Sequence, residues 1–186
     1  MKKILLIATG GTIASTTGKH GLSPTVSAGE LLGFVPEINN FCTADYIQPY
    51  NIDSTNITPA HWLKLAAAIR ENYDDYDGFV VCHGTDTMAY SASAISFMLE
   101  NLSKPVIFTG SQIPLGQIRS DGRDNIISSL LIAASGQVHE VCIYFNGVLL
   151  RGNRSTKRSS DQFEAFESPN DAPLAHAGIQ IEYKKR

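Results

Sequence analysis

Short apolar runs recur along the chain and alternate with segments whose apolar residues follow a helical spacing. Five of these runs are rich in Val, Ile, Leu and Phe with little polar alternation. A near-continuous apolar run of this length is typical of a strand that is covered on both faces of a sheet. The predicted strands comprise residues 3–9, 45–50, 78–83, 105–109 and 140–145.

Three of the intervening segments predict helices. The first begins at Thr58 and Pro59, a favourable N-cap followed by proline at the first helical position. The second opens at Thr85 or Asp86, and the third closes at Gly136, a typical residue just beyond a helix end. The apolar stripes, which we expect to face the core, are Trp62, Leu65, Ala66, Ile69 and Tyr73; Met88, Ala92, Ile95 and Leu99; and Ile127, Leu130, Leu131 and Ala134.

Strands that alternate with helices predict an α/β fold, with three layers and a mainly parallel sheet that carries helices on both faces. The chain has 186 residues, slightly more than one average domain. Residues 15–29 are rich in Ser, Thr and Gly with little periodicity, so we expect a mobile loop there.

Composition narrows the possible partners. The formal net charge is -3 and 43% of the residues are hydrophobic, which argues against both a disordered chain and a protein built to bind nucleic acid. The first apolar run ends at Ala8 and reads as a buried strand rather than a secretory signal. No apolar run approaches the ~20 residues that span a bilayer, so no membrane partner is expected.

The cysteines give no sign of a disulfide framework or a metal site. Cys42, Cys82 and Cys142 are odd in number and far apart, which fits reduced core thiols in a cytoplasmic protein. His83 has no second ligand at metal-binding spacing, so a histidine at a strand end is the better interpretation. No metal is therefore predicted.

Polar turns follow the first four predicted strands, at residues 9–12, 51–55, 83–87 and 110–112. In parallel α/β sheets, ligands bind outside the carboxyl ends of the strands. We therefore expect these four turns to converge on one crevice.

The chemistry of these turns leaves several possibilities open. Gly10-Gly11-Thr12 lacks the fingerprints of dinucleotide and P-loop sites, and Thr12 is either functional or a simple capping residue. If Thr85 and Asp86 lie in the first turn of a helix, their backbone N–H groups favour an anion, although Asp86 alone could be a cap. The basic run 151–158 is either a solvated loop or the source of a buried lysine usable as a base.

Together these segments resemble the bacterial-type L-asparaginase family, most closely the amino-terminal domain of its cytoplasmic type I branch. Its first signature, T-G-G-T-I-A, stands at residues 9–14, and its second, H-G-T-D-T, at residues 83–87. The family's D-S-[ST] loop matches residues 53–55, and the segment that ends in its active-site lysine matches residues 152–157. The resemblance covers nearly the whole of residues 1–186.

The resemblance implies hydrolysis of L-asparagine to L-aspartate and ammonia, with no cofactor and a small-molecule substrate as the partner. It assigns Thr12 as the nucleophile that forms an acyl-enzyme, and Thr85, Asp86 and Lys157 as a second catalytic set. It places Ser54 and Asp86 on the α-carboxylate and α-amino groups of the substrate, with Thr55 alongside. It also implies a homo-oligomer for the full-length protein.

Two departures from the family pattern stand out. Leu22 lies near the place where family members often carry a tyrosine beside the nucleophile. The smaller carboxy-terminal domain that helps close a neighbouring active site in family enzymes is absent from these 186 residues, so this chain is expected to be weakly active or inactive alone. The alternatives are the amidase subunit of a tRNA-dependent amidotransferase, disfavoured because Met1 directly precedes the first strand, and a non-catalytic amino-acid-binding fragment.

Overall fold

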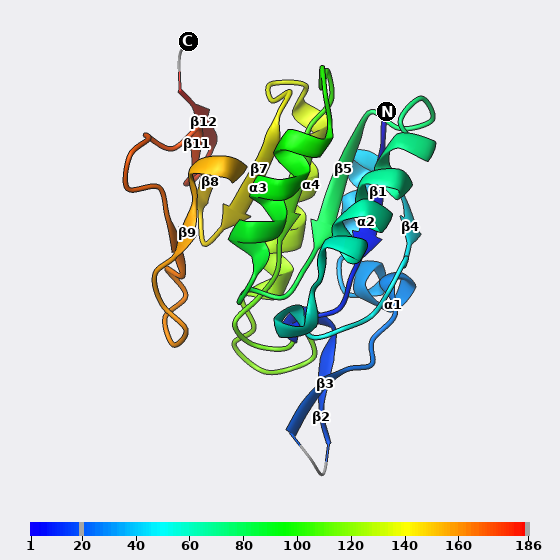
Figure 1. The fold of residues 1–186 in the computed structure, drawn as a ribbon, viewed down its shortest axis with the longest axis vertical. Coiled ribbons are helices and arrows are strands. Elements are labelled where there is room, and N and C mark those ends of the chain that lie inside the picture. The colour runs from blue at the N-terminus through cyan, green and yellow to red at the C-terminus, as the bar shows by residue number, and fades with distance from the viewer. Residues whose placement is uncertain (19–20, 185–186) are drawn as a thin grey trace.

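An eight-stranded sheet runs through the computed structural model, which describes residues 1–18 and 21–184 (Figure 1). The order is β12-β11-β8-β7-β6-β5-β1-β4. The five strands from β7 to β4 are parallel, and β8, β11 and β12 extend the sheet in antiparallel fashion. Their bounds are Lys2–Ala8 (β1), Cys42–Ile47 (β4), Gly78–Cys82 (β5), Val106–Thr109 (β6), Val141–Phe145 (β7), Val148–Arg151 (β8), Ala175–Ala177 (β11) and Ile181–Tyr183 (β12).

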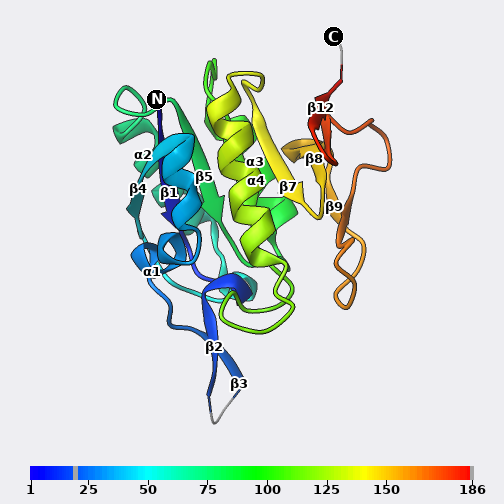
Figure 2. The same ribbon diagram turned by 180° about the vertical axis from the view of Figure 1, so that it is seen from behind.

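Helices cover both faces of this sheet. Helices α2 (Pro59–Glu71) and α3 (Met88–Met98) lie on the face seen in Figure 1, and α1 (Ala28–Gly33) and α4 (Gly122–Ser135) lie on the opposite face (Figure 2). Alternate residues of β1 contribute to the two cores, because successive side chains of a strand point to opposite faces. The predicted three-layer α/β fold with a mainly parallel sheet is confirmed.

The shorter elements lie mostly at the ends of these layers. The 3-10 helices are Thr12–Ala14 (η1), Pro36–Asn40 (η2), Ser54–Asn56 (η3) and Gly152–Arg154 (η4). Two small antiparallel pairs, β2 with β3 and β9 with β10, stand outside the main sheet. Strands β9 and β10 are Thr156–Lys157 and Phe166–Glu167.

The second strand lies earlier in the chain than predicted. The sequence suggested residues 45–50, whereas β4 is Cys42–Ile47. Lys2 of β1 pairs with Cys42, so pairing with β1 sets the position of the strand. Because β4 is an edge strand with partly exposed side chains, its apolar pattern is weak, and Pro49 has no N–H for a ladder.

Two helix predictions need correction. Helix α3 begins at Met88 with Thr87 as its N-cap, so Thr85 and Asp86 lie in the preceding loop rather than in the first helical turn. Helix α4 does close at Gly136, whose φ is 69°, but Leu131 of the predicted core stripe is 37% exposed. The buried face instead includes Ser129, a polar residue that a purely apolar pattern passes over.

The predicted loop at residues 15–29 is wrong for its described part. Strands β2 (Ser15–Gly18) and β3 (Gly21–Pro24) form a hairpin that projects from the body (Figure 1). Ser27 then caps α1, because its side chain accepts from the Glu30 backbone N–H while the Glu30 carboxylate accepts from the Ser27 backbone. The side chain of Leu22 lies outside the part of the chain that the structure describes.

All three cysteines are free and buried, as predicted. Burial raises the pKa of Cys42 to about 11 and that of Cys82 to about 12. Within residues 1–18 and 21–184, no helix is long and apolar enough to cross a membrane. The same residues contain no group of three or more His, Cys, Asp and Glu side chains placed to hold a metal ion.

Candidate active site

A small crevice lies where the first three polar turns meet. Its volume is about 50 Å³, well below the ~300–1,000 Å³ typical of pockets for larger ligands, so it suits a small ligand. The lining residues come from all three turns: Gly11, Thr12, Ser15, Asp53, Ser54, Gly84, Thr85 and Asp86. The structure thus brings together Thr12, Ser54, Thr85 and Asp86, four of the six predicted site residues.

Glycine allows these turns to touch backbone to backbone. Gly11 has a φ of +82°, and a Cβ atom there would overlap the backbone of Gly84. A Cβ atom at Gly84 would in turn collide with the side chain of Ser54. The Gly11 N–H donates to Ile52 O at 3.1 Å. A side chain at either glycine would therefore separate the first turn from the third, or the third from the second.

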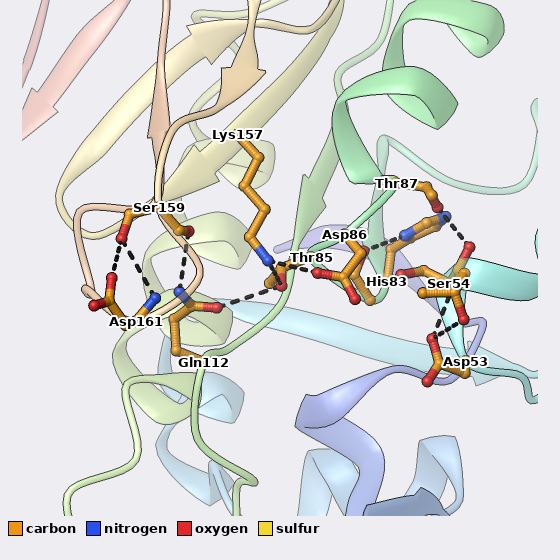
Figure 3. Close-up of polar contacts among 12 residues, drawn as sticks. Asp53, Ser54, His83, Thr85, Asp86, Thr87, Gln112, Lys157, Ser159 and Asp161 are labelled. Carbon is orange, nitrogen blue, oxygen red and sulfur yellow. Dashed lines mark hydrogen bonds and ion pairs between the residues drawn. The ribbon is translucent and has the colours of Figure 1, made fainter.

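Lys157 reaches this crevice from β9 (Figure 3). Its Nζ donates to Thr85 Oγ1 at 2.8 Å and to Asp86 Oδ1 at 2.7 Å. The Lys157 side chain is 16% exposed, compared with 54% for Asp86. Arg151 and Arg158 are 36% and 42% exposed and Arg154 is exposed, so Lys157 is the least exposed cation of the basic run, and its Nζ points at the Thr85 hydroxyl.

Gln112 connects Thr85 to the segment that follows Lys157. Thr85 Oγ1 donates to Gln112 Oε1 at 3.3 Å, and Gln112 Nε2 donates to the carbonyl oxygens of Gln162 at 2.9 Å and Ser159 at 3.4 Å. Figure 3 shows Gln112 between Thr85 and Ser159. In this structure the Thr85 oxygen accepts from Lys157 and donates to Gln112, so the hydroxyl proton lies toward Gln112.

The loop after β4 presents Ser54 and Asp53. Ser54 is 3% exposed, and its carbonyl oxygen accepts from Thr87 Oγ1 at 2.8 Å. Asp53 caps η3, and its Oδ1 accepts from the Thr55 backbone N–H and hydroxyl, both at 2.9 Å. Thr55 is exposed and does not line the crevice, so its contact with the site is indirect, through its hydrogen bonds to Asp53.

His83 lies directly behind these groups and is 1% exposed. Its Nδ1 is 2.7 Å from Gly84 O, and its Nε2 has no hydrogen-bond partner among the described residues. Burial lowers the pKa of His83 to about 4, against the opposing effect of the Gly84 hydrogen bond. The imidazole is therefore neutral at pH 7.

Three residues that contribute to the site lie outside the predicted set. Asp53 and Ser15 line the crevice, and Gln112 joins two of its walls. The D-S-T turn is a local signal for Asp53 as a cap. Ser15 donates to Gly11 O at 2.8 Å, a contact set by the 3-10 turn between them, and nothing in the local sequence marks it.

Comparison with known proteins decides the family. The profile described as "Asparaginase, N-terminal" matches residues 3–186. The chain belongs to the asparaginase family. L-asparaginase 1 of Escherichia coli (strain K12) is 50% identical over 186 residues, which cover 97% of this chain and 54% of that protein.

A solved structure and a more remote relative are also similar to this chain. The crystal structure of L-asparaginase I from Vibrio cholerae O1 biovar eltor matches with a TM-score of 0.91 and 46% identity, over 98% of this chain and 56% of that one. A subunit of the glutamyl-tRNA(Gln) amidotransferase of Metallosphaera sedula is 36% identical over 183 residues, 93% of this chain and 42% of that protein. The chain thus spans about half the length of these relatives.

Proposed function

We propose that the protein is an L-asparaginase, an amidohydrolase that converts L-asparagine and water to L-aspartate and ammonia. The observation that carries this proposal is the contact of Lys157 with Thr85 and Asp86 at the crevice that Thr12 also lines. The Thr12 and Thr85 hydroxyl groups therefore line the same small space, and the Lys157 amine contacts Thr85 and Asp86 at its edge. Membership of the asparaginase family supports the same activity.

In the proposed acylation, the Thr12 hydroxyl oxygen attacks the carbon of the side-chain amide. A threonine hydroxyl is a weak nucleophile at neutral pH and needs a nearby base. The new C–O bond forms as the carbonyl electrons move to oxygen, and the C–N bond then breaks. The proton of the Thr12 hydroxyl is transferred to the amide nitrogen, which leaves as ammonia, and an ester remains on Thr12.

In the proposed deacylation, water attacks this ester and the C–O bond to Thr12 breaks. Lys157 acts here as a base in its unprotonated form: the Thr85 hydroxyl takes a proton from the attacking water and passes its own to Nζ, so the hydrogen bond that Nζ donates to Thr85 Oγ1 in the structure reverses in this step. The ammonium that forms is paired with Asp86 at 2.7 Å. A paired ammonium is favoured over an unpaired one in a site that excludes most water. The proton finally returns to the Thr12 oxygen as the ester C–O bond breaks.

Substrate binding is assigned to two further groups that line the crevice. Ser54 and Asp86 hold the α-carboxylate and α-amino groups. Thr55 contributes by fixing Asp53, whose carboxylate lines the crevice and adds negative charge for the amino group. A cytoplasmic location and a homo-oligomeric assembly are proposed on the resemblance to type I asparaginases.

The test is ammonia release from L-asparagine by the intact protein and by Thr12→Ala and Thr85→Ala. Each substitution is expected to lower kcat/KM by at least about 10³-fold, because each removes a group that acts on the reacting atoms. Thr43→Ala is the matched control, since Thr43 is exposed on β4 and outside the site. Activity retained in both site variants would contradict the assignment.

An amidase subunit of a tRNA-dependent amidotransferase is the second candidate, favoured by the 36% identity to the Metallosphaera sedula protein. The two functions differ in where the ammonia goes. A protein that hydrolyses free asparagine without any added tRNA or synthetase-like partner is an asparaginase. Aspartate binding in calorimetry with no ammonia release would instead indicate a non-catalytic binding fragment.

A further inference from the structure

The imidazole of His83 is buried beside the turn that lines the crevice, and it has no part in the proposed chemistry. It follows β5 at the carboxyl end of the sheet, and its backbone N–H donates to Thr109 O at 2.9 Å. The centre of its ring lies 5.8 Å from that of Phe108, and the side chain is almost fully buried. The main chain of His83 is therefore held by β6, and its side chain has little room to move.

The tautomer of His83 follows from its hydrogen bond. Gly84 O can only accept, so the Nδ1 atom 2.7 Å away must carry the proton and donate it. Nε2 is then a bare acceptor without a partner among the described residues. A neutral ring with one donor engaged and no exposed atom cannot relay a proton to the crevice.

This bond also determines where the next amide points. The peptide bond is planar and trans, so the C=O of Gly84 and the N–H of Thr85 point in opposite directions. With Gly84 O turned toward the buried imidazole, the Thr85 N–H points away from it. No hydrogen bond from this N–H occurs within residues 1–18 and 21–184.

Glycine at position 84 makes this peptide easy to flip. A glycine has far more accessible backbone conformations than other residues, so its ψ angle alone does not fix the peptide plane. In a flipped peptide, Gly84 O would face the crevice and would repel a negative oxygen there. Something other than local backbone preference must hold the observed orientation.

We propose that His83 is a positioning residue that locks the Gly84–Thr85 peptide, so that the Thr85 N–H is available to the oxyanion formed when Thr12 attacks the amide. This inference rests on the proposed function. Preorganised N–H donors that meet a developing negative charge often contribute about 10²–10³-fold to kcat. The ring's preference for the neutral form, caused by burial, keeps Nε2 unprotonated and the Nδ1 donor aimed at Gly84.

Three substitutions in the intact protein separate this role from simple packing. His83→Asn places an amide N–H close to the position of Nδ1, His83→Gln places it near Nε2, and His83→Leu removes the donor. We expect kcat to fall about 10–100-fold in the Gln and Leu variants and less than about 5-fold in the Asn variant. KM for asparagine should change little, because the contact forms only as charge develops.

His176→Asn is the matched control, because His176 is exposed on β11 and remote from the crevice. Equal losses of kcat in all three His83 variants, or a Leu variant with the kcat of the unsubstituted protein, would overturn the inference. A kcat that stays near its original value only in His83→Asn would support it.

A second measurement does not depend on activity. Nitrogen-15 NMR of the unsubstituted protein should show a neutral Nδ1–H imidazole at His83. The Thr85 amide resonance should shift in the Gln and Leu variants and stay near its original position in the Asn variant. An Nε2–H tautomer would overturn the inference, whereas absence of asparagine hydrolysis with the expected spectra would contradict only the proposed function.

Discussion

At the scale of single residues, the site depends on polar side chains that are buried and individually directed. Lys157 and His83 are the clearest pair, since both are largely shielded from water and each contacts one face of the 84–86 turn. Lys157 contacts the Thr85 hydroxyl, and His83 fixes the Gly84 carbonyl. The same short turn is thereby held from its solvent side and from its core side.

The buried His83 predicts a specific dependence of stability on pH. Its pKa is about 4 in the folded chain and 6.5 ordinarily. As pH falls below 6.5, His83 becomes protonated in the unfolded chain but stays neutral in the folded chain. The free energy of unfolding therefore decreases until the pH falls below the pKa of His83 in the folded chain. The expected loss is about 2–3 kcal/mol by about pH 4.5, and none arises above pH 7.

Urea unfolding of the unsubstituted protein and of His83→Asn from pH 7 downward measures this loss. The other four histidines are present in both proteins, so the difference between the two curves isolates His83. If the free energies of unfolding of the two proteins changed in parallel over the whole pH range, burial would not lower the pKa of His83, and the prediction would be wrong.

At the scale of elements, caps and loop anchors place the turns. The Asp121 carboxylate, which precedes α4, accepts from the Gln112 N–H at 3.0 Å, the Ile113 N–H at 3.1 Å and Asn125 Nδ2 at 3.4 Å. Asn125 Nδ2 also donates to Gly110 O at 2.9 Å. The start of α4 therefore holds the whole turn after β6, including the residue that contacts Thr85.

Replacing Asp121 should loosen that turn. We expect Asp121→Ala to lower the free energy of unfolding by about 1–3 kcal/mol, because two backbone N–H groups lose their acceptor. Asp124→Ala is the control, since Asp124 is exposed in the first turn of the same helix and should cost only about 0.3–1 kcal/mol. Denaturant unfolding measures the free energy of unfolding of both variants. Amide hydrogen exchange at Gln112 and Ile113 should become faster only in Asp121→Ala. Equal losses of unfolding free energy in the two variants would contradict this role of Asp121.

Elements with a strong apolar pattern could be predicted, and those set by local polar contacts or pairing could not. The central strands and the buried stripe of α3 follow from burial on both sides. The hairpin of β2 and β3 carries no apolar alternation, although the Ser27–Glu30 capping box at α1 was a readable local signal. The start of α3 was misplaced because Thr85, Asp86 and Thr87 are all acceptable first-turn residues, and tertiary contacts decide among them.

At the scale of the whole molecule, parallel strand order accounts for the convergence of the site. Strands β4, β1 and β5 are neighbours, so their carboxyl-end turns meet at the crevice, and this was predictable from the alternation of strands and helices alone. The position of Lys157 was not predictable in the same way. It arrives from β9, outside the main sheet, and only the family resemblance pointed to it.

The central claim is that Thr12 is the nucleophile of a crevice in which Lys157 and Thr85 act together. The most direct test treats the intact protein with an asparagine analogue that carries an electrophilic carbon in place of the amide, and locates the adduct by peptide mass spectrometry. The adduct is expected on Thr12, with excess aspartate and the Lys157→Met substitution each slowing its formation. An adduct on Thr85 or Ser54 with Thr12 unmodified would contradict the account.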